Sequence, residues 1–350
     1  MEIHQQRTKI QVAVACLLWM VASLAGAAVS QQLFESEVVV QSQAPAERSA
    51  AMKSALEEVL VRVAGQDSVL TTGPAMALLQ KPSRLVQQYR YFTVPDSEPP
   101  ILKLWVRFDG DAIRQSLQQQ GLAYWGAERP DTLLWLAVED RGKRYVVSAD
   151  DNSDVHEQIV QVAKHRGVPI LFPLMDLEDQ SQARFSDIWG GFFEHVLTAS
   201  KRYNPQAVLI GRLNRSTSGG WSARWYMDVA GRTASWSDSR QQLAALLQQG
   251  MDDTADQLAS RFAVANQGGD NVVRISVDGV RTLAAYARIN EYLNSLTSVV
   301  DVQVEQLTGS QVQYSLQLNG GLQGLTRTVS IGTVLEPVAG EVPGSYRLRQ

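Results

Sequence analysis

Apolar residues recur at helix-like or strand-like spacing in three successive blocks of this chain. The first block predicts a strand, a helix with apolar residues every three or four positions, two paired strands and a second helix. These elements cover 33–40, 45–65, 86–93, 101–108 and 112–120. The order β-α-β-β-α indicates a small open-faced α/β sandwich.

The second block contains short continuous apolar runs separated by helical stretches, which is typical of parallel strands covered on both faces. The runs cover 133–138, 169–174 and 207–213, and the helices between them 152–165 and 186–203. Strict alternation over 220–229 and 232–238, joined by Ala230-Gly231, predicts a β-hairpin. A helix over 241–262 with one apolar stripe completes a mixed sheet with helices.

The last block has the order β-α-β-β-α-β, which is the ferredoxin-like arrangement. Its elements cover 272–277, 283–296, 300–304, 312–318, 322–329 and 333–337. The residues from Ala339 onward lack a regular pattern, and we expect a loose tail there. The predicted fold class is therefore α+β or α/β, with three small α/β units at 29–128, 129–265 and 272–338.

The N-terminal segment has the layout of a secretory signal peptide. Arg7 and Lys9 precede an apolar run, 10–24, that ends in the small residues 25–28. The run is shorter than the roughly 20 residues that a bilayer-spanning helix needs. We therefore expect residues 1–28 to be cleaved and the mature chain to be periplasmic. Anchoring to the inner membrane by an uncleaved segment is the alternative.

Composition narrows the class of protein further. The only cysteine, Cys16, lies inside the predicted signal peptide, so the mature chain would have no thiol and no disulfide. The net charge of −4 argues against nucleic acid as a partner. No later segment is long and apolar enough to be a transmembrane helix.

Motifs that would carry catalysis, a metal or a cofactor are missing from the sequence. The histidines of the mature chain, His156, His165 and His195, do not form a His-Glu-x-x-His motif. A phosphate-binding loop, a dinucleotide fingerprint and a serine-hydrolase elbow are also lacking. We predict no catalytic residue, no cofactor and no metal.

Two groups of residues remain as candidate sites. Asp176 and Glu178 follow the second parallel strand, at the edge where α/β sheets often place ligands. A solvated loop is the favoured interpretation, and a catalytic carboxylate is the alternative.

The second group lies on the first strand of the hairpin, where Arg224 and Tyr226 share the polar face and are candidate contact residues. Trp221 and Trp225 share the opposite face, and Trp236 lies on the paired strand. The tryptophans are expected to fill the core beneath the closing helix. A platform that stacks on sugar rings of cell-wall glycan is the alternative.

Four strings suggest a family: Leu33 to Val38, the helix from Glu47 to Gly65, Val168 to Asp176, and Val208 to Leu213. With them the chain resembles the uncharacterised proteobacterial family of exported envelope proteins named "domain of unknown function two thousand and sixty-six". The resemblance implies no established activity. In element order, the middle unit is similar to periplasmic domains of curli-secretion, Tol-system and penicillin-binding-protein activator proteins, and the first unit to a flagellar ring assembly protein.

Together these features predict a non-catalytic periplasmic binding or assembly protein of the bacterial cell envelope. Its expected partner is an envelope protein or the cell-wall glycan. An envelope hydrolase that acts on cell-wall or other glycans near Asp176 or Glu178 is the alternative. A soluble chaperone-like factor for outer-membrane components is a third possibility.

Overall fold

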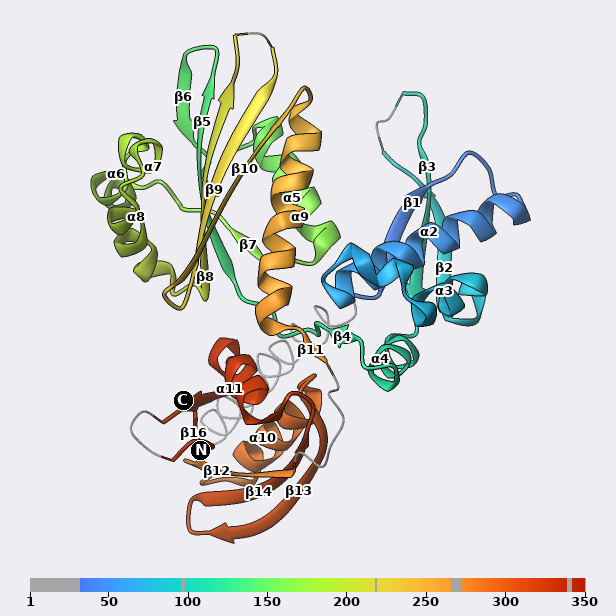
Figure 1. Ribbon diagram of the computed structural model, residues 1–350, viewed down its shortest axis with the longest axis vertical. Helices are drawn as coiled ribbons and strands as arrows, with labels where there is room; N and C mark the ends of the chain where they lie inside the picture. The colour runs from blue at the N-terminus through green and yellow to red at the C-terminus, as the bar shows by residue number, and fades with distance from the viewer. Residues whose placement is uncertain (1–31, 96–97, 218, 266–271, 339–341, 350) are drawn as a thin grey trace, which may run out of the picture. The chain divides into compact units, whose positions relative to one another are not determined.

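The computed structural model describes residues 32–95, 98–217, 219–265, 272–338 and 342–349 (Figure 1). The predicted signal peptide, 1–28, lies outside the described residues. The chain divides into two compact units, Met1–Val59 with Met76–Gln115 and Leu60–Ala75 with Ser116–Gln350. The division into three units made from the sequence stays a prediction. The fold class is mixed α/β, as predicted.

The first unit contains a three-stranded antiparallel sheet in the order β1-β3-β2. Its strands are β1 (Glu35–Val39), β2 (Val86–Thr93) and β3 (Leu102–Phe108). The helical segments along this part of the chain are α2 (Pro45–Ala64), η1 (Asp67–Thr71), α3 (Gly73–Gln80), η2 (Pro82–Arg84) and α4 (Gly110–Gln119), of which η1 belongs to the second unit. The predicted helical spacing is confirmed, because Ala55, Leu56 and Val59 of α2 are fully buried. A hydrogen bond from Ser36 to Glu58 links β1 to α2.

The second unit contains a six-stranded mixed sheet in the order β10-β9-β8-β5-β6, with β7 paired to β5. Its strands are β5 (Thr132–Asp140), β6 (Lys143–Val146), β7 (Ile170–Leu171), β8 (Ala207–Arg215), β9 (Trp221–Val229) and β10 (Arg232–Arg240). β5 is parallel to β8 and to β7. Every residue from Thr132 to Val138 is buried, which agrees with the prediction of a strand covered on both faces.

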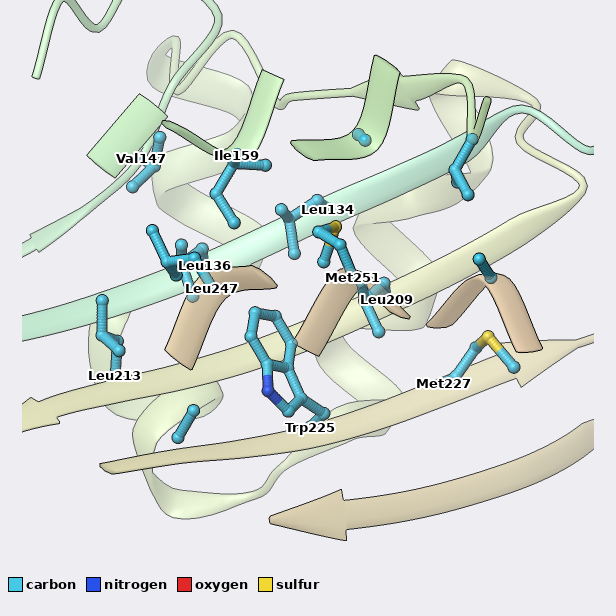
Figure 2. Close-up of a cluster of buried hydrophobic side chains, with 14 of the residues drawn as sticks. Leu134, Leu136, Val147, Ile159, Leu209, Leu213, Trp225, Met227, Leu247 and Met251 are labelled. Carbon is cyan, nitrogen blue, oxygen red and sulfur yellow. The ribbon is translucent and has the colours of Figure 1, made fainter. Parts of the chain in front are cut away.

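Helices cover both faces of this sheet (Figure 1). The helices α5 (Asp154–Arg166) and α9 (Leu243–Phe262) enclose the larger core, in which Trp225 lies between apolar side chains of the sheet and of α9 (Figure 2). Gly211 and Gly250 make room for this indole, since a Cβ atom on either would lie 2.6 Å from its ring. The helices α7 (Phe185–Gly190) and α8 (Phe193–Ser200) pack on the other face.

Two sequence predictions about this unit are wrong in detail. The helix expected over 186–203 is broken into α7, α8 and a 3₁₀ turn, η3 (Lys201–Tyr203), because Gly191 adopts a left-handed conformation with φ of 83°. Only two residues of the run 169–174 form a strand, since Pro169 and Pro173 have no N–H to donate to a ladder. The short helix α6 (Leu177–Gln182) and the strand β6 were not predicted.

The last sheet has the order β13-β14-β12-β16-β15. Its elements are β12 (Val272–Asp278), α10 (Leu283–Ser295), β13 (Val299–Thr308), β14 (Gln311–Leu318), α11 (Gly321–Ile331), β15 (Leu335–Pro337) and β16 (Ser345–Leu348). The order β-α-β-β-α-β is present through β15, but the prediction of a loose tail is wrong. β16 pairs in parallel with β12 and separates it from β15. The buried Tyr346, whose hydroxyl lies 2.9 Å from that of Thr326, holds this strand in place.

Arg129 joins several segments of the second unit. Its guanidinium, only 7% exposed, donates to the carbonyl oxygens of five residues over 2.9–3.1 Å: Arg62, Trp125, Gly126, Arg166 and Gly167. It also lies 3.9 Å from the centroid of the Trp125 ring. Burial is the main cause that lowers its pKa to about 9. Nearby, the short strands β4 (Ala123–Tyr124) and β11 (Val264–Ala265) pair antiparallel.

Candidate functional site

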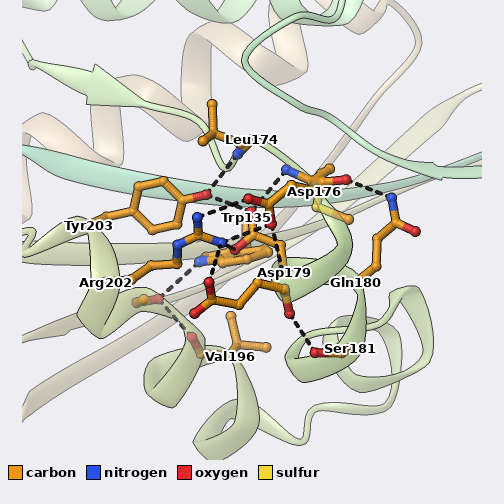
Figure 3. Close-up of polar contacts among 12 residues, drawn as sticks. Trp135, Leu174, Asp176, Asp179, Gln180, Ser181, Val196, Arg202 and Tyr203 are labelled. Atoms are coloured by element: carbon orange, nitrogen blue, oxygen red, sulfur yellow. Dashed lines mark hydrogen bonds and ion pairs between the residues drawn. The ribbon is translucent and has the colours of Figure 1, made fainter.

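The carboxylates predicted after β7 converge on one arginine (Figure 3). Asp176 accepts two hydrogen bonds from Arg202, at 2.8 Å to Nη1 and 2.9 Å to Nη2. Glu178 lies 3.5 Å from the same Nη1. Asp176 is also the N-cap of α6, where its side chain accepts a hydrogen bond from the backbone N–H of Asp179. The two predicted residues are therefore brought together by an arginine that the sequence did not single out.

A third carboxylate, Asp179, is the buried centre of this network. It is fully buried and accepts hydrogen bonds from Arg202 at 3.1 Å, from the Tyr203 hydroxyl at 2.5 Å and from the Met175 N–H at 2.9 Å. Burial, followed by the hydrogen bond to Asp179, raises the pKa of Tyr203 to about 12. The hydrogen bonds from Arg202 are the main cause that lowers the pKa of Asp176 to about 2.

This electrostatic environment suits a structural role better than proton transfer. A glycosidase needs one carboxylic acid whose pKa is raised, so that it can protonate the leaving group. The pKa of Asp176 moves in the opposite direction. Across the described ranges, no group of three potential metal ligands was found. The network ties α6 to η3 and thereby fixes the loop that follows β7.

The tryptophans of the hairpin belong to the core. Trp221 and Trp225 are 8% and 2% exposed, and they lie in the cluster beneath α5 and α9. Trp236 is half-buried and packs against the same cluster. The prediction that they fill the core is confirmed, and a glycan platform built from Trp221 and Trp225 is contradicted by their burial.

Arg224 and Tyr226 lie on the opposite face of β9, next to residues from α8 and β8. The Tyr226 ring stacks on Phe193 with centroids 4.2 Å apart. The guanidinium of Arg212 lies 5.6 Å from the centroid of the same Phe193 ring, and its Nη1 donates to the Trp189 carbonyl oxygen at 2.7 Å. Trp189 in turn stacks on Phe185 at 5.2 Å.

These side chains form a surface that we name the aromatic–arginine surface. It consists of Phe185, Trp189, Phe192, Phe193, Arg212, Arg224 and Tyr226, where Phe192 is included because its ring lies against Gly190, next to Trp189. Most of its rings are half-buried, and Phe192 is 62% exposed. Arg224 and Tyr226 were predicted from the sequence as contact residues, and that role stays a prediction. The other members were not predicted, although aromatic residues on both sides of Gly190-Gly191 were a visible signal.

The two arginines of this surface have no carboxylate as an ion-pair partner in the part of the chain that the structure describes. Within the described ranges, neither Arg212 nor Arg224 forms an ion pair, whereas three arginines of β6, β8 and β10 do. These ion pairs are Arg144 with Glu139, Arg215 with Asp140 and Arg240 with Asp238. Burial lowers the pKa of Arg212, and the nearby charge of Arg224 lowers it further.

Comparisons with known proteins add little about activity. Residues 27–126 match the model of a family described as "Domain of unknown function (DUF8605)". No curated protein matches the chain. A solved structure titled "Crystal structure of uncharacterized protein" is similar to 38% of this chain and to 91% of its own, with 12% identity and a TM-score of 0.19.

The family match corrects the sequence analysis. The family predicted there, "domain of unknown function two thousand and sixty-six", is contradicted by the match to a different family of unknown function. The strings that suggested it are elements of regular structure, such as α2 and β8, rather than catalytic signatures. With one cysteine, the chain can form no internal disulfide. No helix in the ranges that the structure describes is long and apolar enough to cross a bilayer.

Proposed function

We propose that this chain is a non-catalytic binding or assembly protein of the bacterial cell envelope, which works from the periplasm by contact with an envelope partner. The observation that carries the proposal is the aromatic–arginine surface. Aromatic residues and arginine are enriched in protein interfaces and among the residues that dominate binding energy. The aromatic–arginine surface has this composition, because it combines the exposed ring of Phe192 with the guanidinium of Arg224, which forms no ion pair with a described residue.

The carboxylates support contact over hydrolysis. Asp176, Glu178 and Asp179 share one arginine, and the pKa of Asp176 is lowered rather than raised. The alternative function, an envelope hydrolase acting on glycans at Asp176 or Glu178, therefore draws no support from the arrangement of these groups.

Photo-crosslinking in living cells that produce the chain tests the contact surface. A photoreactive amino acid replaces Phe192, or in the control Val160, which is exposed on α5 at the opposite face of the same sheet. We expect a discrete crosslinked product from position 192 and none from position 160. The substitution Arg224→Glu should reduce that product at least about fivefold, since charge reversal at an interface costs about 1 kcal/mol or more. Equal products at both positions, or none, would rule out this surface.

The location in the periplasm rests on residues 1–28 and has its own test. Cell fractionation and mass spectrometry should find a periplasmic chain that begins near Ala28. Replacing Leu17 and Leu18 by arginine interrupts the apolar run and should retain the chain in the cytoplasm. A full-length chain in the membrane fraction would favour the anchored alternative, and a full-length wild-type chain in the cytoplasm would end the proposal of export.

A further inference from the structure

The Arg212–Arg224 pair is a like-charge pair at the centre of a sheet. The two residues are direct partners in the antiparallel register of β8 and β9, so their side chains project from the same face. Directly opposed residues have Cβ atoms about 4.5–5.5 Å apart, and like charges at that spacing repel one another. A fold gains nothing from this repulsion, which suggests that the pair serves another purpose.

The rest of the same cross-strand row is small and uncharged. Ala137 of β5 is the partner of Arg212, and Ser237 of β10 is the partner of Arg224. Neither neighbouring strand supplies a carboxylate in this row. In the next row toward one end of the sheet, Asn214 and Ser222 add hydrogen-bonding groups, and the carboxylate of Glu139, the partner of Asn214, is already paired with Arg144. The short side chains leave the guanidinium groups without a large neighbour in their own row.

Arg212 is held in position by neutral groups. Its Nη1 donates to the Trp189 carbonyl oxygen, and its guanidinium lies over the Phe193 ring. A Cβ atom on Gly191 would lie 3.8 Å from Nη2, so this glycine borders the guanidinium closely. The remaining donors of Arg212 have no partner among the described residues. The burial that lowers its pKa also strengthens its attraction to an anion, because the local dielectric is lower.

We propose that Arg212 and Arg224 form a binding site for an oxyanion, either a carboxylate or a phosphate group, of a ligand that also contacts Phe193 and Tyr226. Guanidinium groups bind both oxyanions through paired, charge-assisted hydrogen bonds. The ligand neutralises the two charges that the fold leaves opposed. The inference rests on the proposed function, since it uses the same surface, but it names the chemical group that is recognised.

Calorimetric titration of the purified full chain with inorganic phosphate, and separately with succinate, tests the inference. At low ionic strength we expect saturable binding of at least one anion, with a dissociation constant of about 1 mM or lower. Arg224→Gln should weaken it at least tenfold. Arg240→Gln, whose arginine is paired with Asp238 and lies on the opposite face of the sheet, is the matched control and should bind as the wild type does. The anion that binds identifies the phosphate or carboxylate source.

Arg212→Lys adds a second variant that keeps the charge but loses the planar fork, and it should bind between wild type and Arg224→Gln. Failure of both anions to bind the wild type, or equal binding by Arg224→Gln, would overturn the inference. If crosslinking through position 192 still succeeds in that case, contact function stands and only the oxyanion site is lost. Anion binding without any crosslinked product would support the oxyanion site and would rule out the contact function proposed for this surface.

Discussion

Arg202 and Arg212 lie ten positions apart in the chain, yet their surroundings are opposite. Arg202 lies within 3.5 Å of three carboxylates, whereas Arg212 forms no ion pair with any described residue and faces a second arginine. Both guanidinium groups lie over an aromatic ring, Arg202 over Tyr203 at 5.3 Å and Arg212 over Phe193 at 5.6 Å. The rings are common to both sites, so the acids make the difference. An arginine that carboxylates neutralise stabilises the fold, whereas an arginine without such partners is available to bind a ligand.

Asp179→Ala is expected to have the largest effect on stability, because it disrupts the carboxylate network around Arg202. The substitution removes the acceptor of hydrogen bonds from Arg202, Tyr203 and Met175 in a fully buried position. We expect the free energy of unfolding to fall by about 3 kcal/mol, as is typical when a buried charged group is removed from its partners. Denaturant unfolding measures it. Glu178→Ala is the matched control, and its exposed side chain should change the value by less than about 0.5 kcal/mol. Equal losses in the two variants would contradict the central place of Asp179.

A smaller, pH-dependent effect is expected from Asp176. Its pKa in the folded chain is about 2, below the ordinary value of 3.8, so its ionised form stabilises the fold. This stabilisation is complete above about pH 4 and is lost as the pH falls through about 2. The thermal midpoint of the wild type should exceed that of Asp176→Asn at pH 5, and the difference should shrink toward pH 2. A difference that stays constant over this range would show that the charge of Asp176 does not contribute to the stability of the network around Arg202.

The smallest effect on stability is expected from Arg224→Gln. Because the substitution removes a repulsion, the free energy of unfolding should stay unchanged or rise by about 0.3 kcal/mol. Added salt screens the repulsion, so it should stabilise the wild type more than the variant. Unfolding at low and high sodium chloride measures both effects. A loss above about 1 kcal/mol would mean that Arg224 holds the structure and is not free for a ligand.

Local sequence signals predicted most elements of the fold. The Ala230-Gly231 turn joins β9 and β10 as expected, with φ of 52° and 77°, the positive values that a two-residue hairpin turn requires. The buried run of β5 was equally clear. The strand β16 was missed because Tyr346 and Leu348 are too short an alternation to be distinguished from an irregular tail.

The sites were only partly predictable, because their partners are distant in the chain. Asp176 and Glu178 were selected, but the buried Asp179 was not, since nothing local shows which acid faces Arg202 and Tyr203. Arg212 becomes notable only when the register of β8 and β9 places it opposite Arg224. Hydrogen bonds of this kind join residues more than twenty positions apart, beyond the reach of periodicity.

The hydrogen bonds of Arg129 have a consequence for the stability of the fold at low pH. All five acceptors are peptide oxygens, which take up no proton at any pH that the chain would meet. Acidification that weakens the carboxylates around Arg202 therefore leaves this connection untouched. The segments that meet at Arg129 should stay tied together after the loop beyond β7 has loosened.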